Sequence, residues 1–269
     1  MRVFIVSDME GVAGITKWAQ VSAGEPLYQE GRKLYTDEIN ATVAGAASAG
    51  ANEIVVMDCH GAGGDSNFNS LIPERLDERC EWVVQNEWTE YTAVLEQGCD
   101  AALFIGMHAM AGSPTGVLSH TVSGTHWYNL RFNGSPVGET GINAALCGHW
   151  GTPVLLVSGD TAVCKEARDL LGIGVTTVPV KQGLGRFSAR HLPPRRARGL
   201  IEERTRNALG DLLAVHAYDP GRPCEISVDL SGPDRTEEYR YREGCEIVGG
   251  RTVVARGDDW LTAWRRLYL

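Results

Sequence analysis

Short runs of apolar residues, several of them rich in β-branched side chains, alternate along the chain with longer segments of mixed polarity. The runs that predict strands lie at residues 3–6, 54–57, 82–84, 101–105, 154–157 and 175–178. Between them, apolar residues near helical spacing predict helices at residues 28–49, 91–97, 141–150 and 162–171. Gly50 is a suitable stop for the first of these helices.

Apolar strands separated by helices are typical of a parallel sheet that is covered on both faces. The strand–helix–strand order recurs several times along the first two thirds of the chain. The sequence therefore predicts an α/β fold with a doubly wound, mostly parallel sheet.

Two regions depart from this pattern. Residues 117–122 and 127–132 have the character of strands, with Asn133-Gly134 as a tight turn, and predict a β insertion at about residues 114–135. A long amphipathic helix is predicted at residues 195–213. It is followed by strands at 225–230 and 252–255, a Gly249-Gly250 turn and a helix at 258–267. We therefore expect an α/β domain over residues 1–180 and a second, smaller α+β domain over residues 181–269.

Composition and charge narrow the functional classes. The chain has 269 residues, of which 43% are hydrophobic, and carries a formal net charge of -9, which disfavours nucleic acid as a partner. No apolar run approaches the length of about 18 residues that a membrane-spanning helix requires, and the N-terminal run is too short for a signal peptide. The seven cysteines are scattered without a CxxC pair, which favours a reducing compartment, so we expect a cytoplasmic protein.

Carboxylates and imidazoles follow four of the predicted strands. They are Asp8 and Glu10 after the first strand, Asp58 and His60 after the second, His108 after the strand at 101–105, and Asp160 after the strand at 154–157. Glycines stand beside them and let the backbone turn tightly. Because ligands of open parallel sheets bind beyond the carboxyl ends of the strands, this recurrence predicts a functional site at that edge.

The residue types indicate a metal site. A single Asp or His in such a place is more often a cap, a turn former or a hydrogen-bonded core residue, and we favour that interpretation for Asp58 and Asp160. The whole set would be costly to bury unless it were paired or bound to metal. Imidazole with carboxylate, without clustered thiolates, suits catalytic zinc, manganese or iron. Asp8 and Glu10 share one face of an extended segment, so both could reach one metal or bridge two.

The chain resembles the D-aminopeptidase (DppA-like) family of zinc metallopeptidases over nearly its full length. Six pieces in the same order carry the resemblance: Asp8-Met9-Glu10-Gly11, Asp58-Cys59-His60, Gly106-Met107-His108-Ala109, Gly116-Val117-Leu118-Ser119-His120, Pro136-Val137-Gly138-Glu139 and Val180-Lys181-Gln182. The resemblance implies an aminopeptidase that removes N-terminal residues, D-amino acids among them, from short peptides. It also implies a ring-like homo-oligomer.

The resemblance further implies two zinc ions in each subunit, for which manganese or cobalt could substitute. The implied ligands are Asp8 as the bridging carboxylate, Glu10 and His60 on one metal, and His108 and Glu139 on the other. Without the resemblance, Glu139 would be interpreted as a carboxylate at a helix N-terminus. His120 matches the catalytic histidine of the family, which would stabilise the oxyanion or transfer a proton, although a structural β residue is the alternative.

Lys181 and Arg186 lie at the expected domain junction, where they could hold a peptide carboxylate or the oxyanion. An exposed surface charge is an equally suitable interpretation of each. Cys59 adjoins His60, but neighbouring residues of an extended segment point to opposite faces, which disfavours a Cys–His nucleophile.

Three other functions would use similar metal ligands. A metal-dependent amidase acting on non-peptide amides would need the same ligands. A two-metal phosphoesterase would also use such a site, but the chain has no P-loop and no basic cluster near the motifs. A non-catalytic metal-binding module would not need an open coordination position or His120.

Overall fold

The computed structural model describes residues 1–85 and 92–268, and within them the largest sheet has seven strands. In order across this sheet they are β3 (Glu81–Val83), β2 (Glu53–Asp58), β1 (Arg2–Ser7), β4 (Ala101–Met107), β7 (Val154–Asp160), β8 (Thr176–Gly185) and β9 (Ser188–His191). Neighbouring strands pair in parallel except for the β8–β9 hairpin, which is antiparallel. The predicted mostly parallel sheet is therefore confirmed.

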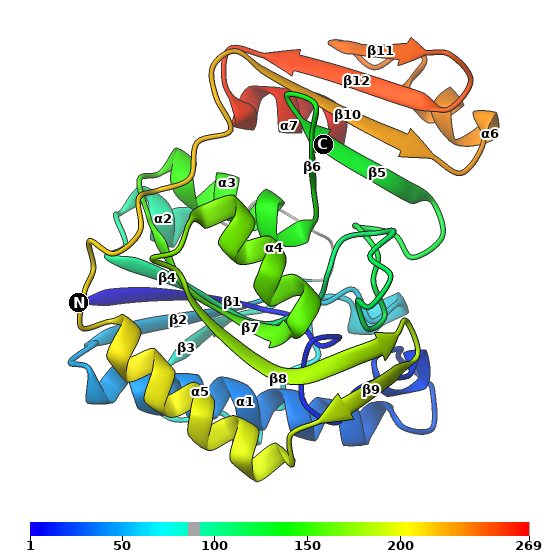
Figure 1. Cartoon of the computed structure of the whole chain (residues 1–269). Helices are drawn as coiled ribbons and strands as arrows, with labels where there is room; N and C mark the ends of the chain where they lie inside the picture. Colours follow the sequence, from blue (N-terminus) through cyan, green and yellow to red (C-terminus); the bar gives the residue numbers. More distant parts are fainter. Residues whose placement is uncertain (86–91, 269) are drawn as a thin grey trace.

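Helices cover both faces of the large sheet (Figure 1). On one face α1 (Tyr28–Ser48) packs beside α5 (Pro194–Ala208). On the other face lie α3 (Glu139–His149) and α4 (Thr161–Leu171), which also contact each other. From β1 the chain runs outward to β2 and β3 and then returns to β4 on the opposite side of β1. This doubly wound order places a topological switch point between β1 and β4, where such sheets bind their ligands.

A second, antiparallel sheet lies beyond α3, with strand order β11-β12-β10-β5-β6 (Figure 1). Its strands are β5 (Trp127–Phe132), β6 (Ser135–Val137), β10 (Cys224–Leu230), β11 (Cys245–Val248) and β12 (Thr252–Gly257). The helix α7 (Trp260–Tyr268) packs on β10 and β12 and also contacts α3, so it lies between this sheet and the rest of the molecule. The short helix α6 (Pro233–Thr236) follows β10.

The expected division of the chain at residue 181 differs from this arrangement. Lys181 lies inside β8, and both β9 and α5 belong to the large sheet and its covering layer. The small sheet instead combines β5 and β6, from the predicted insertion, with the strands after residue 223, since β10 pairs directly with β5. The insertion and the C-terminal region are therefore one structural layer rather than an insertion and a separate domain.

The local predictions had different outcomes. The Asn133-Gly134 turn is confirmed, with both residues at positive φ (47° and 81°), as a two-residue hairpin turn between β5 and β6 requires. The strand predicted at residues 117–122 is wrong, because this segment is an irregular loop. The predicted helix at 91–97 is described only from residue 92, and within that part α2 spans Ala93–Glu96. The β9 strand was not predicted.

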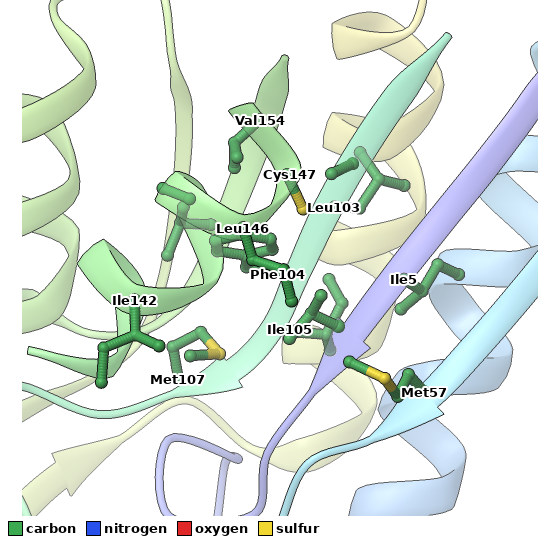
Figure 2. Packing of buried hydrophobic residues seen from close by; sticks show 14 of the residues in the cluster. Ile5, Met57, Leu103, Phe104, Ile105, Met107, Ile142, Leu146, Cys147 and Val154 are labelled. Atoms are coloured by element: carbon green, nitrogen blue, oxygen red, sulfur yellow. The ribbon is translucent and has the colours of Figure 1, made fainter. Parts of the chain in front are cut away.

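The core is continuous between α3 and the large sheet. Figure 2 shows Ile142, Leu146 and Cys147 of α3 beside Phe104 and Met107 of β4. Leu146 is 3% exposed, and Phe104 and Cys147 are fully buried. Burial of this kind stabilises a protein by about 1.5–3 kcal/mol for each large apolar side chain. The packing fixes the axis of α3, and so fixes where its first residue, Glu139, lies relative to the ends of the strands.

All seven cysteines are free, in agreement with the absence of a disulfide pattern in the sequence. None of the described helices combines the length and the apolar character needed to cross a bilayer.

Candidate metal centre

The loops that follow β1 and β4 cross each other closely at the switch point. Asp8 N–H donates to the carbonyl of Ile105 (2.9 Å), and Gly11 N–H donates to the carbonyl of Gly106 (2.7 Å). A Cβ atom at Gly106 would lie 2.0 Å from the carbonyl oxygen of Asp8, and Gly106 has a φ of 73°. Only glycine fits at this crossing. The crossing brings the residues after the two strands to one place.

Asp8 lies at the middle of the candidate site, and its two carboxylate oxygens face different imidazoles. Oδ1 is 3.1 Å from Nδ1 of His60, and Oδ2 is 3.3 Å from Nε2 of His108. The side chain is almost fully buried. A carboxylate with one oxygen toward each side can bridge two cations.

Each side of Asp8 carries a second carboxylate. On one side, Oε2 of Glu10 is 3.0 Å from Nδ1 of His60. On the other side, Oε1 of Glu139 is 3.3 Å from Nε2 of His108. Two ligands of one tetrahedral zinc ion, each about 2.1 Å from the metal, lie about 3.4 Å apart. The ligand atoms of both pairs are therefore close to the separation that a shared ion would require.

Backbone carbonyls fix the tautomer of all three histidines in the site. His60 donates from Nε2 to the carbonyl of Val21 (2.7 Å), His108 from Nδ1 to Ala109 (3.0 Å), and His120 from Nδ1 to Leu118 (2.9 Å). A carbonyl can only accept, so the other nitrogen of each ring is the one that can bind a metal once it has lost its proton. In every case that second nitrogen faces the carboxylates, as in metal sites whose histidines are oriented by an outer hydrogen bond.

Two polar atoms in the site are buried without a hydrogen-bond partner among the described residues. They are Oε2 of Glu10 and Nε2 of His108. Leaving such atoms unpaired costs free energy, so native proteins satisfy them. A cation beside each of these atoms would satisfy it, and the donor set therefore fits metal ions such as zinc.

The charges of the site also favour a bound metal ion. Burial alone would raise the pKa of Asp8, but the hydrogen bond with His60 and the positive field of His108 lower it below its usual value. Burial alone would lower the pKa of His108, but the charges of Glu139 and Asp8 raise it well above its usual value. The carboxylates thus hold positive charge in the site, and a metal ion can take the place of those protons.

His120 reaches the site from the irregular loop at residues 117–122. Its ring stacks on that of His108, with centroids 4.0 Å apart, and its Nε2 is 3.7 Å from Oε1 of Glu139. Ligand atoms of His108, His120 and Glu139 lie close enough to hold one ion, as do those of Asp8, Glu10 and His108. His120 therefore occupies a position suited either to a ligand or to a group acting beside the metal.

The loop around His120 has an unusual backbone. Leu118 and Val122 have φ values of 52° and 60°, which Leu and β-branched residues rarely adopt. The loop is held by its neighbours: Leu118 N–H donates to the carbonyl of Arg186 (2.8 Å), and Val122 N–H donates to Oε1 of Glu139 (2.8 Å). Such backbone conformations persist only where surrounding contacts enforce them.

A pocket opens over the candidate ligands. Four of the candidate ligands (Asp8, Glu10, His60 and Glu139) and His120 line it, together with residues from four other parts of the chain: Cys59, Gly61, Phe68, Val122, Ile142, Asn143, Trp264 and Tyr268. No motif predicts the last four, because their positions depend on how α3 and α7 pack together. Only the spacing of Ile142 and Asn143 from Glu139, three and four residues, could have placed them on one helix face.

Lys181 does not line this pocket, so the expected role in binding a peptide carboxylate is not supported. Its buried ammonium group donates to the carbonyls of Glu10 (2.5 Å), Val12 (2.9 Å) and Ile15 (2.7 Å). An ammonium group has three donors, and all three are used. Lys181 instead fixes the loop that carries Glu10.

Replacing Lys181 with Met should therefore lower the free energy of unfolding by about 3–5 kcal/mol, because it leaves three buried carbonyls and nearby carboxylates without their cation. Urea denaturation of the metal-free protein measures this loss. The matched control is Lys165→Met, since Lys165 is exposed on α4 and forms an exposed ion pair with Asp169, and it should change stability by less than about 0.5 kcal/mol. Equal stability of the two variants would show that Lys181 does not hold the loop.

Arg186 also lies outside the pocket lining. Its Nε donates to the carbonyl of Ser119 (3.1 Å), and its guanidinium group lies over the ring of Trp18 at 5.7 Å. Arg186 thus holds the His120 loop rather than facing a substrate.

The remaining polar residues after the strands are structural. Asp160 caps α4 by accepting from the backbone N–H groups of Ala162 and Val163 (both 2.9 Å), as expected for a cap. Asp58 accepts from the N–H groups of Ser70 and Leu71. Cys59 lines the pocket, but burial and the charge of Asp58 raise the pKa of its thiol well above the usual value, which disfavours a thiolate nucleophile.

Similarity to known proteins extends over the whole chain. A family model described as D-aminopeptidase (Peptidase M55) matches residues 1–269. The D-aminopeptidase of Bacillus subtilis (strain 168) is 33% identical over 272 residues, which cover 99% of this chain and 95% of that protein. A solved structure, described as the Zn-dependent D-aminopeptidase DppA from Bacillus subtilis, a self-compartmentalizing protease, superposes with a TM-score of 0.91 at 31% identity, covering 99% of this chain and 95% of that one.

Proposed function

This chain belongs to the D-aminopeptidase family, and from that premise we propose that it removes N-terminal amino acids, D-amino acids among them, from short peptides at a dinuclear zinc centre. Membership supports a metal-dependent aminopeptidase, and the zinc dependence of the Bacillus subtilis structure supports zinc as the metal. Manganese and cobalt prefer the same ligand types and are the alternatives.

The observation that carries the dinuclear proposal is the position of Asp8 between two imidazole–carboxylate pairs. In this proposal Asp8 would supply one oxygen to each ion, Glu10 and His60 would complete one site, and His108 and Glu139 would complete the other. The two unpartnered buried atoms, Oε2 of Glu10 and Nε2 of His108, belong to different sites.

When bound, the zinc ions would polarise the scissile carbonyl and lower the pKa of a bound water. The protein supplies the remaining steps. The carbonyls of Val21 and Ala109 keep the ligating nitrogens of His60 and His108 turned inward. Nε2 of His120 faces the site with its lone pair, so it can take a proton from the attacking water and pass it to the leaving amine.

The lining of the pocket separates this function from its alternatives. No Lys or Arg side chain is among the described residues that line it, whereas phosphoester substrates require cationic groups beside the metals. A two-metal phosphoesterase is therefore disfavoured. An amidase acting on non-peptide amides would use the same groups, and substrate tests must distinguish it.

The assembly and the location of the enzyme are also proposed. The Bacillus subtilis structure is that of a self-compartmentalizing protease, which supports a homo-oligomer, ring-like in form, for this chain. Seven free cysteines suit a reducing compartment such as the cytoplasm.

Release of free amino acid from matched D- and L-alanyl dipeptides tests the proposed function. We expect zinc-loaded protein to cleave them, chelator-treated protein to be inactive, and added zinc to restore the activity, because the ions supply the nucleophile. Faster release from the D-substrate would support the stereochemical part of the proposal. Cleavage of simple amides with no cleavage of either dipeptide would instead establish the amidase.

A further inference from the structure

Asn143 is a polar residue of the pocket that the metal centre does not use. It lies four residues after Glu139 on α3, so the two side chains share one face of the helix and stand one turn apart. Ile142, three residues after Glu139, lies on the same face and lines the same pocket. α3 thus presents to the pocket one candidate metal ligand, one amide and one apolar side chain.

The amide of Asn143 has no hydrogen-bond partner within residues 1–85 and 92–268. The residue is 6% exposed and nevertheless lines the pocket, so its remaining accessible surface faces that space. A polar group that faces a pocket and has no partner within the protein is satisfied by water or by a ligand there. The amide of Asn143 is therefore available to hydrogen-bond a ligand that enters the pocket.

The other groups around it indicate the charge of that ligand. Apart from the proposed metal ligands, the wall of the pocket beside Asn143 carries the aromatic rings of Trp264 and Tyr268. Aromatic faces and amide oxygens attract ammonium groups. A peptide C-terminus would need Lys or Arg, and none is among the described lining residues. The lining thus suits the amino end of a peptide.

We propose that Oδ1 of Asn143 accepts a hydrogen bond from the N-terminal ammonium group of the substrate, beside the aromatic side chains of Trp264 and Tyr268. This interaction rests on the proposed function and deepens it, because it gives the reason why the enzyme would require a free amino terminus. Asn143 is then a substrate-binding residue that positions the N-terminal amino acid with its carbonyl at the metal centre.

The test compares Asn143→Ala and Asn143→Asp with Asn207→Ala, a control in which an exposed asparagine of α5 is removed from the opposite face of the sheet. With an alanyl-p-nitroanilide as substrate, we expect Asn143→Ala to raise KM about 10- to 100-fold, the effect of losing one hydrogen bond to a charged group. Zinc content should not change. Asn143→Asp should recover most of the affinity, since a carboxylate also accepts from ammonium.

Calorimetric titration at pH 7 with alaninamide, which has the ammonium group, and propionamide, which lacks it, shows which group is bound. Wild-type protein should prefer alaninamide, and Asn143→Ala should lose about 10- to 100-fold of that preference. Equal weakening of both ligands, or no change in either, would overturn the proposal. If the wild-type protein cleaved no aminoacyl substrate, the proposed function would fail, whereas this titration would still decide the role of Asn143.

Discussion

Protein carrying Asp8→Asn is expected to lose bound zinc and to retain less than about 1 part in 10⁴ of the peptidase activity, since a metal centre contributes several kcal/mol and each 1.36 kcal/mol is tenfold in rate. The reason is geometric: the two oxygens of Asp8 face His60 and His108 on opposite sides. Asn keeps the shape and can still accept from Met9 N–H, as Asp8 does at 2.8 Å. It cannot offer two anionic oxygens.

Zinc analysis of the purified protein, run beside the activity assay and circular dichroism, measures this effect. Asp169→Asn is the control, because it neutralises an exposed carboxylate of α4 whose ion-pair partner is the exposed Lys165, and it should keep both zinc and activity. An Asp8→Asn protein that is folded and still holds two zinc ions would show that Asp8 does not bridge them. Loss of one ion alone would place Asp8 in a single site.

Replacing His120 with Ala is expected to lower kcat by about 10²–10⁴-fold, the usual contribution of a positioned proton-transfer group, while zinc content stays the same. Nε2 of His120 faces the site but lies 3.7 Å from Glu139, farther than the atoms within either proposed metal site. We therefore expect the metal ions to remain without it.

The control is His126→Ala, in the segment between the His120 loop and β5, where Nδ1 of His126 lies 3.4 Å from Oγ of Ser231 and His126 is not a residue of the pocket lining. This variant should behave as wild type in kcat and in zinc content. If His120→Ala loses one equivalent of zinc together with its activity, His120 is a ligand, as its nearness to His108 and Glu139 also permits. If kcat is unchanged, His120 is a structural residue of its loop.

The central strands β1, β2, β4 and β7 could be predicted because each is short and buried on both faces. Residues 117–122 look the same in sequence but form a loop. Val117 and Leu118 are fully buried, yet their backbone N–H groups donate to the side chain of Asp160 and to the carbonyl of Arg186. Burial accounts for the apolar residues there, and the hydrogen bonds that decide between strand and loop come from distant parts of the chain.

The candidate ligands could be located for a related reason. A parallel sheet gathers the ends of its strands at one edge, so Asp8, His60 and His108 had to approach each other once the strands were recognised. Nothing similar holds for Trp264 and Tyr268, whose places depend on the small sheet bringing α7 against α3. The role of Lys181 could not be predicted for a similar reason. Its three partners are backbone carbonyls about 170 positions earlier, and every residue has a backbone carbonyl, so no pattern of side chains marks them.

The pairing of β5 with β10 also affects how the enzyme is made. During translation β5 leaves the ribosome long before β10, the strand with which it pairs through Phe132 and Ile226. The edge of β5 that binds β10 therefore stays unpaired until β10 has been synthesised. All the proposed zinc ligands have been synthesised by residue 139, whereas the wall formed by Trp264 and Tyr268 is synthesised near the end. Lys181 and Arg186, which hold the Glu10 and His120 loops, also precede this wall in the chain, so a nascent chain can complete the support of its metal centre before it has the pocket wall that faces a peptide.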